Sequence, residues 1–292
     1  MFLYAAAAPT EGTNNAWAVA CVELHDGRPV VGMINIGPDS VTYSEFSVRV
    51  AAHEIAHALG FEVEVFDARN MVQMIPEVRG KNNVLVVSSP KTLEKTRAHF
   101  KCTGAPGMEL EDEGGGSTAS SHWKRRNAKD ELMAGIPSAS YYTALTMAAF
   151  EDMGFYRAQW SMAEQMPWGN NSGCELLTEK CLTDGVNRYP ELFCRARRRI
   201  PVCTSDRLAL GACRTIIYPN PLPAQFQYFT GPRRGGVIGD KMDYCPYIKG
   251  YKDRRCINGG ARYAWKPHWP KVKVLKIGWA ARFCWSHWGR LR

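Results

Sequence analysis

The feature that most constrains this 292-residue chain is the pentapeptide His53-Glu54-Ile55-Ala56-His57. On an α-helix, side chains four residues apart project from the same face about one turn apart, so two imidazoles at this spacing can share a metal ion. A carboxylate at the position of Glu54 lies beside such an ion, where it can take a proton from a water molecule. We therefore predict that His53 and His57 are zinc ligands and that Glu54 is a general base.

The flanking residues predict that this segment is a buried helix. Apolar residues recur at helical offsets from 44 to 59, Ser44 can cap the start, and Gly60 stands where the helix would end. The same pentapeptide can occur by chance on an exposed helix, as two surface histidines beside a glutamate. The small and apolar residues around it favour a buried active-site helix.

Zinc in a catalytic site needs a third protein ligand, and the spacing of the residues does not select it. The shortest related pattern would place a histidine at position 63, which is Val63, so that pattern is excluded. A downstream glutamate, such as Glu77 or Glu94, is one alternative. The other candidates are the remaining histidines of the chain, which are His25, His99, His122, His268 and His287.

The rest of the chain mixes strand and helix signals, which predicts an α+β fold. Residues 16–36 indicate a β-hairpin, and residues 140–153 indicate a second helix. The acidic and glycine-rich run 109–117 predicts a flexible loop. Beyond Pro167, frequent Gly, Pro and Cys predict short elements joined by disulfides.

The distribution of charge argues against a nucleic-acid partner. The formal net charge is +9, but residues 261–292 hold eight Lys or Arg and no Asp or Glu. The remainder has 29 basic against 28 acidic residues, so the body of the protein is nearly neutral. The same end of the chain holds five of the nine tryptophans. We expect residues 259–292 to form a basic, Trp-rich, disordered tail.

The cysteines indicate an oxidising compartment. Seven of the ten lie between 174 and 256 with irregular spacing and no paired CxxC elements, which favours disulfides over a structural zinc site. The sequon beginning at Asn170 is a candidate glycosylation site and fits a secretory route. The chain shows neither a signal peptide nor an anchor signal, which predicts either a cytosolic protein with reduced thiols or a fragment of something longer.

A more specific signal comes from eight segments in order along the chain. They are His53–Phe61, Ser121–Trp123, Arg126–Met133, Tyr141–Met147, Met166–Gly169, Leu210–Cys213, Gln227–Thr230 and Met242–Pro246. Through them the sequence, from about Trp17 to Cys256, resembles the leishmanolysin family of zinc surface metallopeptidases.

This resemblance implies a metzincin-like zinc peptidase core with an inserted subdomain at 62–121. It also implies that His122 is the third zinc ligand and that Met133 lies in a turn beneath the zinc. The ring nitrogens of the three histidines should then converge within about 3–4 Å of one another. We assign no catalytic role to Asp130 and Glu131, which we expect to be helix-capping or solvated charges.

The resemblance further implies disulfides that link Cys102 to Cys174, Cys181 to Cys245, and Cys194 to Cys213. Four cysteines would then lack their usual partners, namely Cys21, Cys203, Cys256 and Cys284.

By the same likeness the chain divides into four parts. Residues 1–61 end an N-terminal catalytic subdomain, and 62–180 hold the insertion and a central subdomain. A partial, cysteine-rich and loop-dominated C-terminal subdomain at 181–258 precedes the tail at 259–292.

The implied function is a zinc endopeptidase acting on protein and peptide substrates. Such a protein would be secreted or at the cell surface, with a link to cell adhesion and membrane association through parts that this chain lacks. The alternative is a catalytically incompetent fragment or paralogue that acts as a binding or surface protein.

Overall fold

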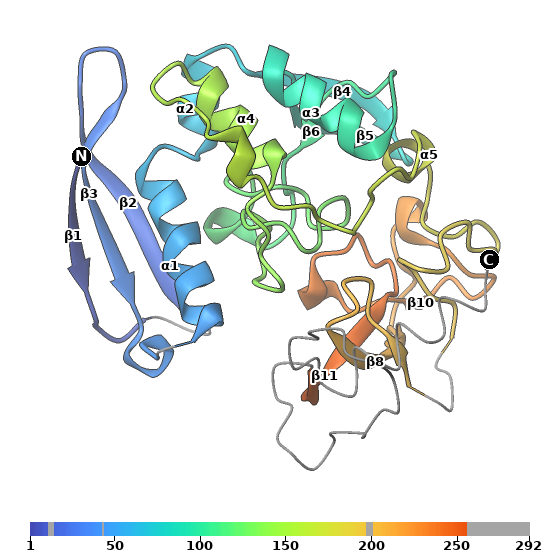
Figure 1. Cartoon of the computed structure of the whole chain (residues 1–292). Coiled ribbons are helices and arrows are strands. Elements are labelled where there is room, and N and C mark those ends of the chain that lie inside the picture. Colours follow the sequence, from blue (N-terminus) through green and yellow to red (C-terminus); the bar gives the residue numbers. More distant parts are fainter. Residues whose placement is uncertain (11–14, 43, 197–200, 256–292) are drawn as a thin grey trace, which may run out of the picture. The chain divides into compact units, whose positions relative to one another are not determined.

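The computed structural model describes residues 1–10, 15–42, 44–196 and 201–255 (Figure 1). The chain divides into two compact units, Met1–Glu179 and Lys180–Arg292. Among the described residues, no helix combines the length and the apolarity that crossing a membrane requires. The tail predicted at 259–292 lies outside the described residues.

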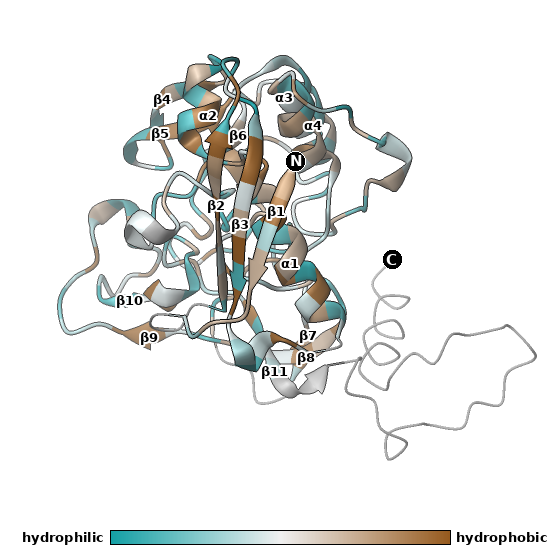
Figure 2. Ribbon diagram, turned by 90° about the vertical axis from the view of Figure 1, so that its left-hand side faces the viewer, coloured by the Kyte–Doolittle hydropathy of each residue, from teal (hydrophilic) through white to brown (hydrophobic). Residues whose placement is uncertain are grey.

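The first unit begins with a three-stranded sheet that supports the pentapeptide helix. β1 (Phe2–Ala6) pairs in parallel with β3 (Pro29–Ile36), and β2 (Ala16–Glu23) pairs antiparallel with the other edge of β3. The predicted hairpin is confirmed as β2 and β3. Figure 2 shows the apolar stretches of these strands, against which the helix α1 (Glu45–Ala58) packs.

The bounds of α1 match the helix predicted from 44 to 59. Ser44 caps the helix, because its side chain accepts a hydrogen bond from the backbone N of Ser47 at 3.1 Å. Gly60 follows the helix with a φ of +99°, a left-handed conformation that glycine adopts at little cost. The chain therefore turns sharply away just after the second histidine.

The insertion after α1 forms a second sheet with two helices. Its strands β4 (Val72–Val78), β5 (Lys81–Val87) and β6 (Met108–Glu109) pair antiparallel in the order β4-β5-β6. α2 (Val63–Ala68) precedes this sheet, and α3 (Pro90–Phe100) connects β5 to β6. Residues 63–109 thus form an ordered part of the first unit with their own hydrogen-bonded sheet.

The helix predicted over 140–153 is α4 (Ala144–Asp152), which begins later than expected. Thr143 caps it by accepting a hydrogen bond from Leu145 N at 3.1 Å. Ser140 has a left-handed φ of +53°, which is incompatible with a right-handed helix at that residue. α4 packs against α3.

The run 109–117, which we expected to be a flexible loop, is buried in its first part. Glu109 ends β6 and lies 2.6 Å from Arg79, and Glu111, 1% exposed, lies 2.6 Å from Lys124. The expectation is wrong for these residues because buried cations compensate the acidic side chains.

The second unit consists mainly of turns and short strands, as the frequent Gly, Pro and Cys predict. Its strands form two sheets, ordered β11-β8-β7 and β10-β9. They are β7 (Val202–Cys203), β8 (Ala209–Cys213), β9 (Ile216–Ile217), β10 (Arg234–Gly235) and β11 (Ile248–Arg255). The remaining short helices along the chain are η1 (Pro38–Ser40), η2 (Gly115–Ser117), η3 (Trp160–Met162), α5 (Glu175–Thr178), η4 (Ala224–Phe226) and η5 (Ile238–Asp240). The chain is a mixed α+β protein.

The three predicted disulfides are confirmed. Their Cα–Cα separations are 4.7 Å for Cys102–Cys174, 6.0 Å for Cys181–Cys245 and 5.8 Å for Cys194–Cys213.

Of the four cysteines expected to lack partners, Cys21 is free and exposed. Cys203 is disulfide-bonded, so the expectation is wrong for that residue. Cys256 and Cys284 lie outside the described residues.

Candidate metal centre

Three histidines from two parts of the first unit, helix α1 and the segment around residue 122, meet at one point. The Nε2 atoms of His53 and His57 lie 3.1 Å apart, and His122 Nε2 lies 3.1 Å from the former and 3.2 Å from the latter. Tetrahedral zinc with Zn–N bonds of ~2.0–2.1 Å holds its ligand atoms about 3.3 Å apart. The observed spacing suits such an ion, and the three side chains can together hold a metal.

The two alternative glutamates lie elsewhere. Glu77 is exposed on β4, and Glu94 is exposed on α3, where it lies 2.6 Å from Lys95. Among the described residues, neither belongs to a group that can hold a metal. Of the other histidines, His25 is exposed and His99 Nε2 lies 2.9 Å from the carbonyl of Trp168. His268 and His287 are outside the described residues.

Hydrogen bonds to backbone carbonyls fix the orientation of all three rings. Nδ1 lies 2.7 Å from Leu132 O in His53, 3.0 Å from Phe61 O in His57, and 3.0 Å from Thr118 O in His122. Because a carbonyl only accepts, each Nδ1 carries the hydrogen and each neutral ring presents a lone pair at Nε2. Three lone pairs aimed at one point repel one another unless a cation lies between them. This donor set therefore fits zinc.

Burial and a nearby carboxylate control the charges of the site. Burial lowers the pKa of His53 to about 3, and the neighbouring His57 adds to this effect. Burial also raises the pKa of Glu54 to about 7. For His57, burial lowers the pKa, but a hydrogen bond to the Glu62 carboxylate, 3.0 Å from Nδ1, helps to raise it on balance. The carboxylates of Glu62 and Glu54 both raise the pKa of His57, so they favour a positive charge near the histidines.

Glu54 differs from the other buried glutamates near the site. It is 7% exposed, and none of the described residues forms a hydrogen bond or an ion pair with its carboxylate. Glu109, Glu111 and Glu131 each accept two or more hydrogen bonds. A buried carboxylate that the protein leaves unpaired can exchange a proton with a bound molecule.

The segment after Lys129 runs beside two of the histidines. Leu132 supplies the carbonyl for His53, and the carbonyl of Met133 accepts a hydrogen bond from Trp123 N at 2.9 Å. A Cβ added to Gly135 would lie 3.6 Å from the ring of His122. Met133 itself is fully buried. Sequence reasoning did not find these supporting carbonyls, because a backbone oxygen leaves no signature in the sequence.

Asp130 and Glu131, which we expected to be capping or solvated charges, are both fully buried. Asp130 pairs with Lys129, and Glu131 accepts hydrogen bonds from Thr143 and Thr146. The expectation is wrong because a neighbouring lysine satisfies Asp130 inside the protein, and hydroxyl groups later in the sequence satisfy Glu131.

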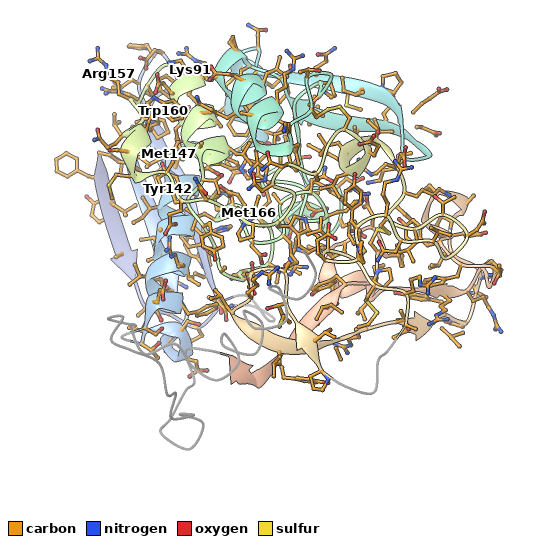
Figure 3. The ribbon with its side chains drawn as sticks, turned by 45° about the vertical axis from the view of Figure 1, so that its right-hand side comes forward. Lys91, Tyr142, Met147, Arg157, Trp160 and Met166 are labelled. Atoms are coloured by element: carbon orange, nitrogen blue, oxygen red, sulfur yellow. A yellow bond between two sulfur atoms is a disulfide. The ribbon has the colours of Figure 1, made fainter. Side chains whose placement is uncertain are left out.

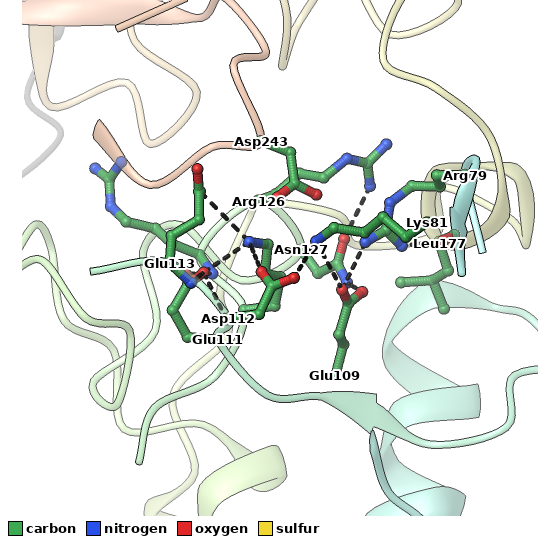
Figure 4. Close-up of polar contacts among 12 residues, drawn as sticks. Arg79, Lys81, Glu109, Glu111, Asp112, Glu113, Arg126, Asn127, Leu177 and Asp243 are labelled. Carbon is green, nitrogen blue, oxygen red and sulfur yellow. Dashed lines mark hydrogen bonds and ion pairs between the residues drawn. The ribbon is translucent and has the colours of Figure 1, made fainter. Parts of the chain in front are cut away.

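A buried ion cluster holds the segment around His122 (Figure 4). The Lys124 ammonium lies 2.6 Å from Glu111 and 2.5 Å from Asp112. The backbone of Glu111 also binds this segment, because its N donates to His122 O at 2.8 Å and its O accepts from Ser120 N at 2.7 Å. The segment around His122 is therefore anchored without any regular secondary structure.

A cavity of about 600 Å³ lies beside α1 and α4. Its walls are mainly apolar and include Tyr142 and Met147, labelled in Figure 3. Arg49, one helical turn before His53, reaches across it to Glu164 with nitrogen–oxygen distances of 2.5 and 2.6 Å. The hollow can take an apolar side chain next to the charged pair.

Comparison with known proteins gives a consistent result. Residues 1–272 match the model of the family described as Leishmanolysin, Peptidase M8. The chain is 45% identical over 257 residues to leishmanolysin of Leishmania major, covering 87% of this chain and 42% of that protein. It is 45% identical over 249 residues to the leishmanolysin homolog of Crithidia fasciculata, covering 84% and 38%. A leishmanolysin-like peptidase of Drosophila melanogaster is 27% identical over 362 residues, covering 96% and 53%. The chain spans about 40% of the length of the leishmanolysins that it matches.

Proposed function

The chain belongs to the leishmanolysin family of metallopeptidases, and from this premise we propose that it is a zinc-dependent endopeptidase that hydrolyses protein substrates. The observation that carries the proposal is the convergence of three Nε2 lone pairs in the neighbourhood of Glu54, a buried carboxylate with which none of the described residues pairs.

His53, His57 and His122 would hold the zinc through Nε2, and the carbonyls at Nδ1 would keep the rings aimed at it. A bound zinc ion supplies Lewis acidity that polarises a peptide carbonyl and makes a water molecule more acidic. We assign Met133 to the buried turn beneath the histidines, where it fills space and is not a ligand.

Glu54 acts as the proton carrier in this proposal. Its carboxylate accepts a proton from the attacking water and passes it to the departing amine nitrogen. Glu54 follows His53 on α1 and does not belong to the group of side chains that can hold the metal, which supports a role beside the ion and not as its ligand.

The disulfides support a location in an oxidising environment, and we propose that the protein is secreted or at the cell surface. Asn170 is exposed in a turn and is the candidate for a glycan. A second candidate function is metal binding without catalysis, which the short coverage of the relatives keeps open.

The test uses the purified full chain. We expect one zinc per chain by atomic absorption, hydrolysis of denatured casein, loss of hydrolysis on removing the metal with a chelator, and recovery on adding zinc. A chain that binds no zinc would refute the proposal. A chain that binds one zinc but cleaves neither casein nor a mixed peptide library would be a metal-binding paralogue.

A further inference from the structure

Glu131 is a buried carboxylate that the proposed reaction does not use. Its side chain is fully buried, and no cationic side chain among the described residues pairs with it. It accepts hydrogen bonds from Met133 N at 2.5 Å, Thr143 Oγ1 at 2.8 Å and Thr146 Oγ1 at 2.7 Å. Burying a carboxylate costs free energy even when it is hydrogen-bonded. The groups that these hydrogen bonds hold in place therefore indicate what the residue does.

The first bond leads to His53 through a single peptide group. The N–H of Met133 and the C=O of Leu132 belong to the same planar peptide unit and point in opposite directions. Glu131 holds the N–H, and the C=O lies 2.7 Å from His53 Nδ1. Fixing one end of the unit fixes the other, and the carboxylate polarises the peptide so that its carbonyl is a stronger acceptor.

The second set of bonds leads to the segment of His122. Thr146 Oγ1 donates to Glu131 and accepts from the indole N–H of Trp123 at 2.8 Å. The backbone N of Trp123 donates to the carbonyl of Met133. Trp123 directly follows His122, so both its ring and its backbone are tied to groups that Glu131 holds.

We propose that Glu131 is a positioning residue for the metal centre: through the Leu132–Met133 peptide it orients His53, and through Thr146 and Trp123 it fixes His122. This inference rests on the proposed function, because it assigns a role toward the zinc. Glu131 thereby joins ligands that stand 69 residues apart in the sequence.

A purely structural role predicts something different. Glu131 also anchors the start of α4 through Thr143, and loss of that anchor alone would lower stability without changing the affinity of the folded protein for zinc. A positioning role predicts weaker zinc binding by protein that is still folded.

The test compares Glu131→Gln with wild type in the full chain. The amide has one acceptor oxygen, so its NH₂ group must face either the Met133 N–H or the threonine hydroxyls. We expect zinc affinity, measured by competition with a chelator, to fall about 10–100-fold. The visible absorption of the cobalt(II)-loaded protein, which reports ligand geometry, should also change. Near-ultraviolet circular dichroism selects conditions in which the variant is folded.

The matched control is Asp152→Asn at the other end of α4. The Asp152 carboxylate also accepts several hydrogen bonds, from Ser89 Oγ, Lys91 N and Thr92, but none of them leads to a histidine. We expect this variant to lose stability and to keep wild-type zinc affinity and cobalt spectrum.

Several results would overturn the inference. Glu131→Gln with wild-type zinc affinity and an unchanged cobalt spectrum would do so, as would an equal loss of affinity in Asp152→Asn. If Glu131→Gln does not fold, Thr146→Val is the deciding variant, because it removes the hydroxyl that links Glu131 to Trp123. We expect its zinc affinity to fall by less than that expected for Glu131→Gln. An unchanged zinc affinity in Thr146→Val would refute the inference. A wild-type chain that binds neither zinc nor cobalt would refute the proposed function as well, which distinguishes the two failures.

Discussion

Helix α1 and the segment 118–135 both supply the metal centre, but different forces hold them. In α1 the spacing of His53 and His57 follows from helical geometry, and a local cap starts the helix. His122 has no helix around it, although its ring lies against the nearby carbonyl of Thr118. Its segment is held by hydrogen bonds between residues further apart in sequence, from Glu111 to His122 and from Trp123 to Met133 and Thr146. Two of the three ligands are therefore positioned by local helix geometry and the third by tertiary contacts. Only the local pair has a spacing that can be recognised in the sequence.

The two regions also bury different side chains. α1 turns small and apolar residues such as Val50, Ala56 and Ala58 toward the protein. The second region buries charged groups, including Lys124, Asp130 and Glu131, at less than 1% exposure. A buried apolar side chain can be replaced by another of similar volume at little cost in stability, whereas a buried charge is destabilising unless it has a specific partner. The second region should be the more sensitive of the two to single polar substitutions.

The largest expected effect separates chemistry from metal binding within α1. Glu54→Gln should lower peptide hydrolysis by about 10²–10⁴-fold, because proton transfer is lost, while one zinc per chain is kept. Fluorogenic peptide cleavage and atomic absorption measure the two quantities, and the exposed Glu94→Gln is the control. Loss of zinc in Glu54→Gln would show that the residue serves the metal and not the proton.

The next prediction concerns the stability of the segment 118–135, which is held by tertiary contacts. Lys124→Met leaves the Glu111 carboxylate buried without its nearest cation, and the free energy of unfolding should fall by about 3–5 kcal/mol. Lys91→Met removes a half-exposed cation from its pair with Glu151 and should cost less than about 1 kcal/mol. Urea unfolding measures both. Equal losses in the two variants would contradict the greater sensitivity expected of the buried charges in the second region.

Stability should also depend on pH through Glu131. Burial raises its pKa in the folded protein to about 7, above the ordinary value of 4.5, although the bonds from Thr146, Met133 and Thr143 oppose the shift. Between these pH values the folded state keeps a proton that the unfolded state releases, so the free energy of unfolding falls as pH rises, by up to about 3 kcal/mol. Subtracting the pH profile of Glu131→Gln isolates this contribution. A difference profile that rises with pH would contradict the assignment.

The smallest expected effect concerns α1, whose start is fixed by a local cap. Ser44→Ala removes the cap of α1 and should lower the free energy of unfolding by about 1 kcal/mol, with zinc affinity unchanged. Ser44→Asp, which restores an acceptor, should recover most of the loss. A large change in zinc affinity for Ser44→Ala would mean that α1 depends on its cap for the ligand geometry itself.

Features that depend on neighbours in sequence could be predicted. The hairpin and α1 follow from alternation, helical periodicity and capping residues. The histidine pair follows from its spacing, whereas His122 and the three disulfides came only from the family resemblance. The acidic run at 109–117 and Glu131 were misjudged because their cations and hydroxyl donors lie elsewhere in the chain. Asp130 was misjudged although its cation, Lys129, is its neighbour in sequence, because nothing in the sequence shows that both side chains are buried. In the sequence such residues are indistinguishable from a solvated surface.

The disulfide between Cys102 and Cys174 has a consequence for how the chain responds to being cut. It closes a loop over a separation of 72 residues that contains His122, Met133 and the whole of α4. A single break of the backbone anywhere inside that loop leaves both pieces covalently attached. Electrophoresis would show such a nick only after reduction of the disulfides. After a cut between Cys102 and His122, the piece carrying α1 thus keeps the piece carrying the third histidine at a high local concentration.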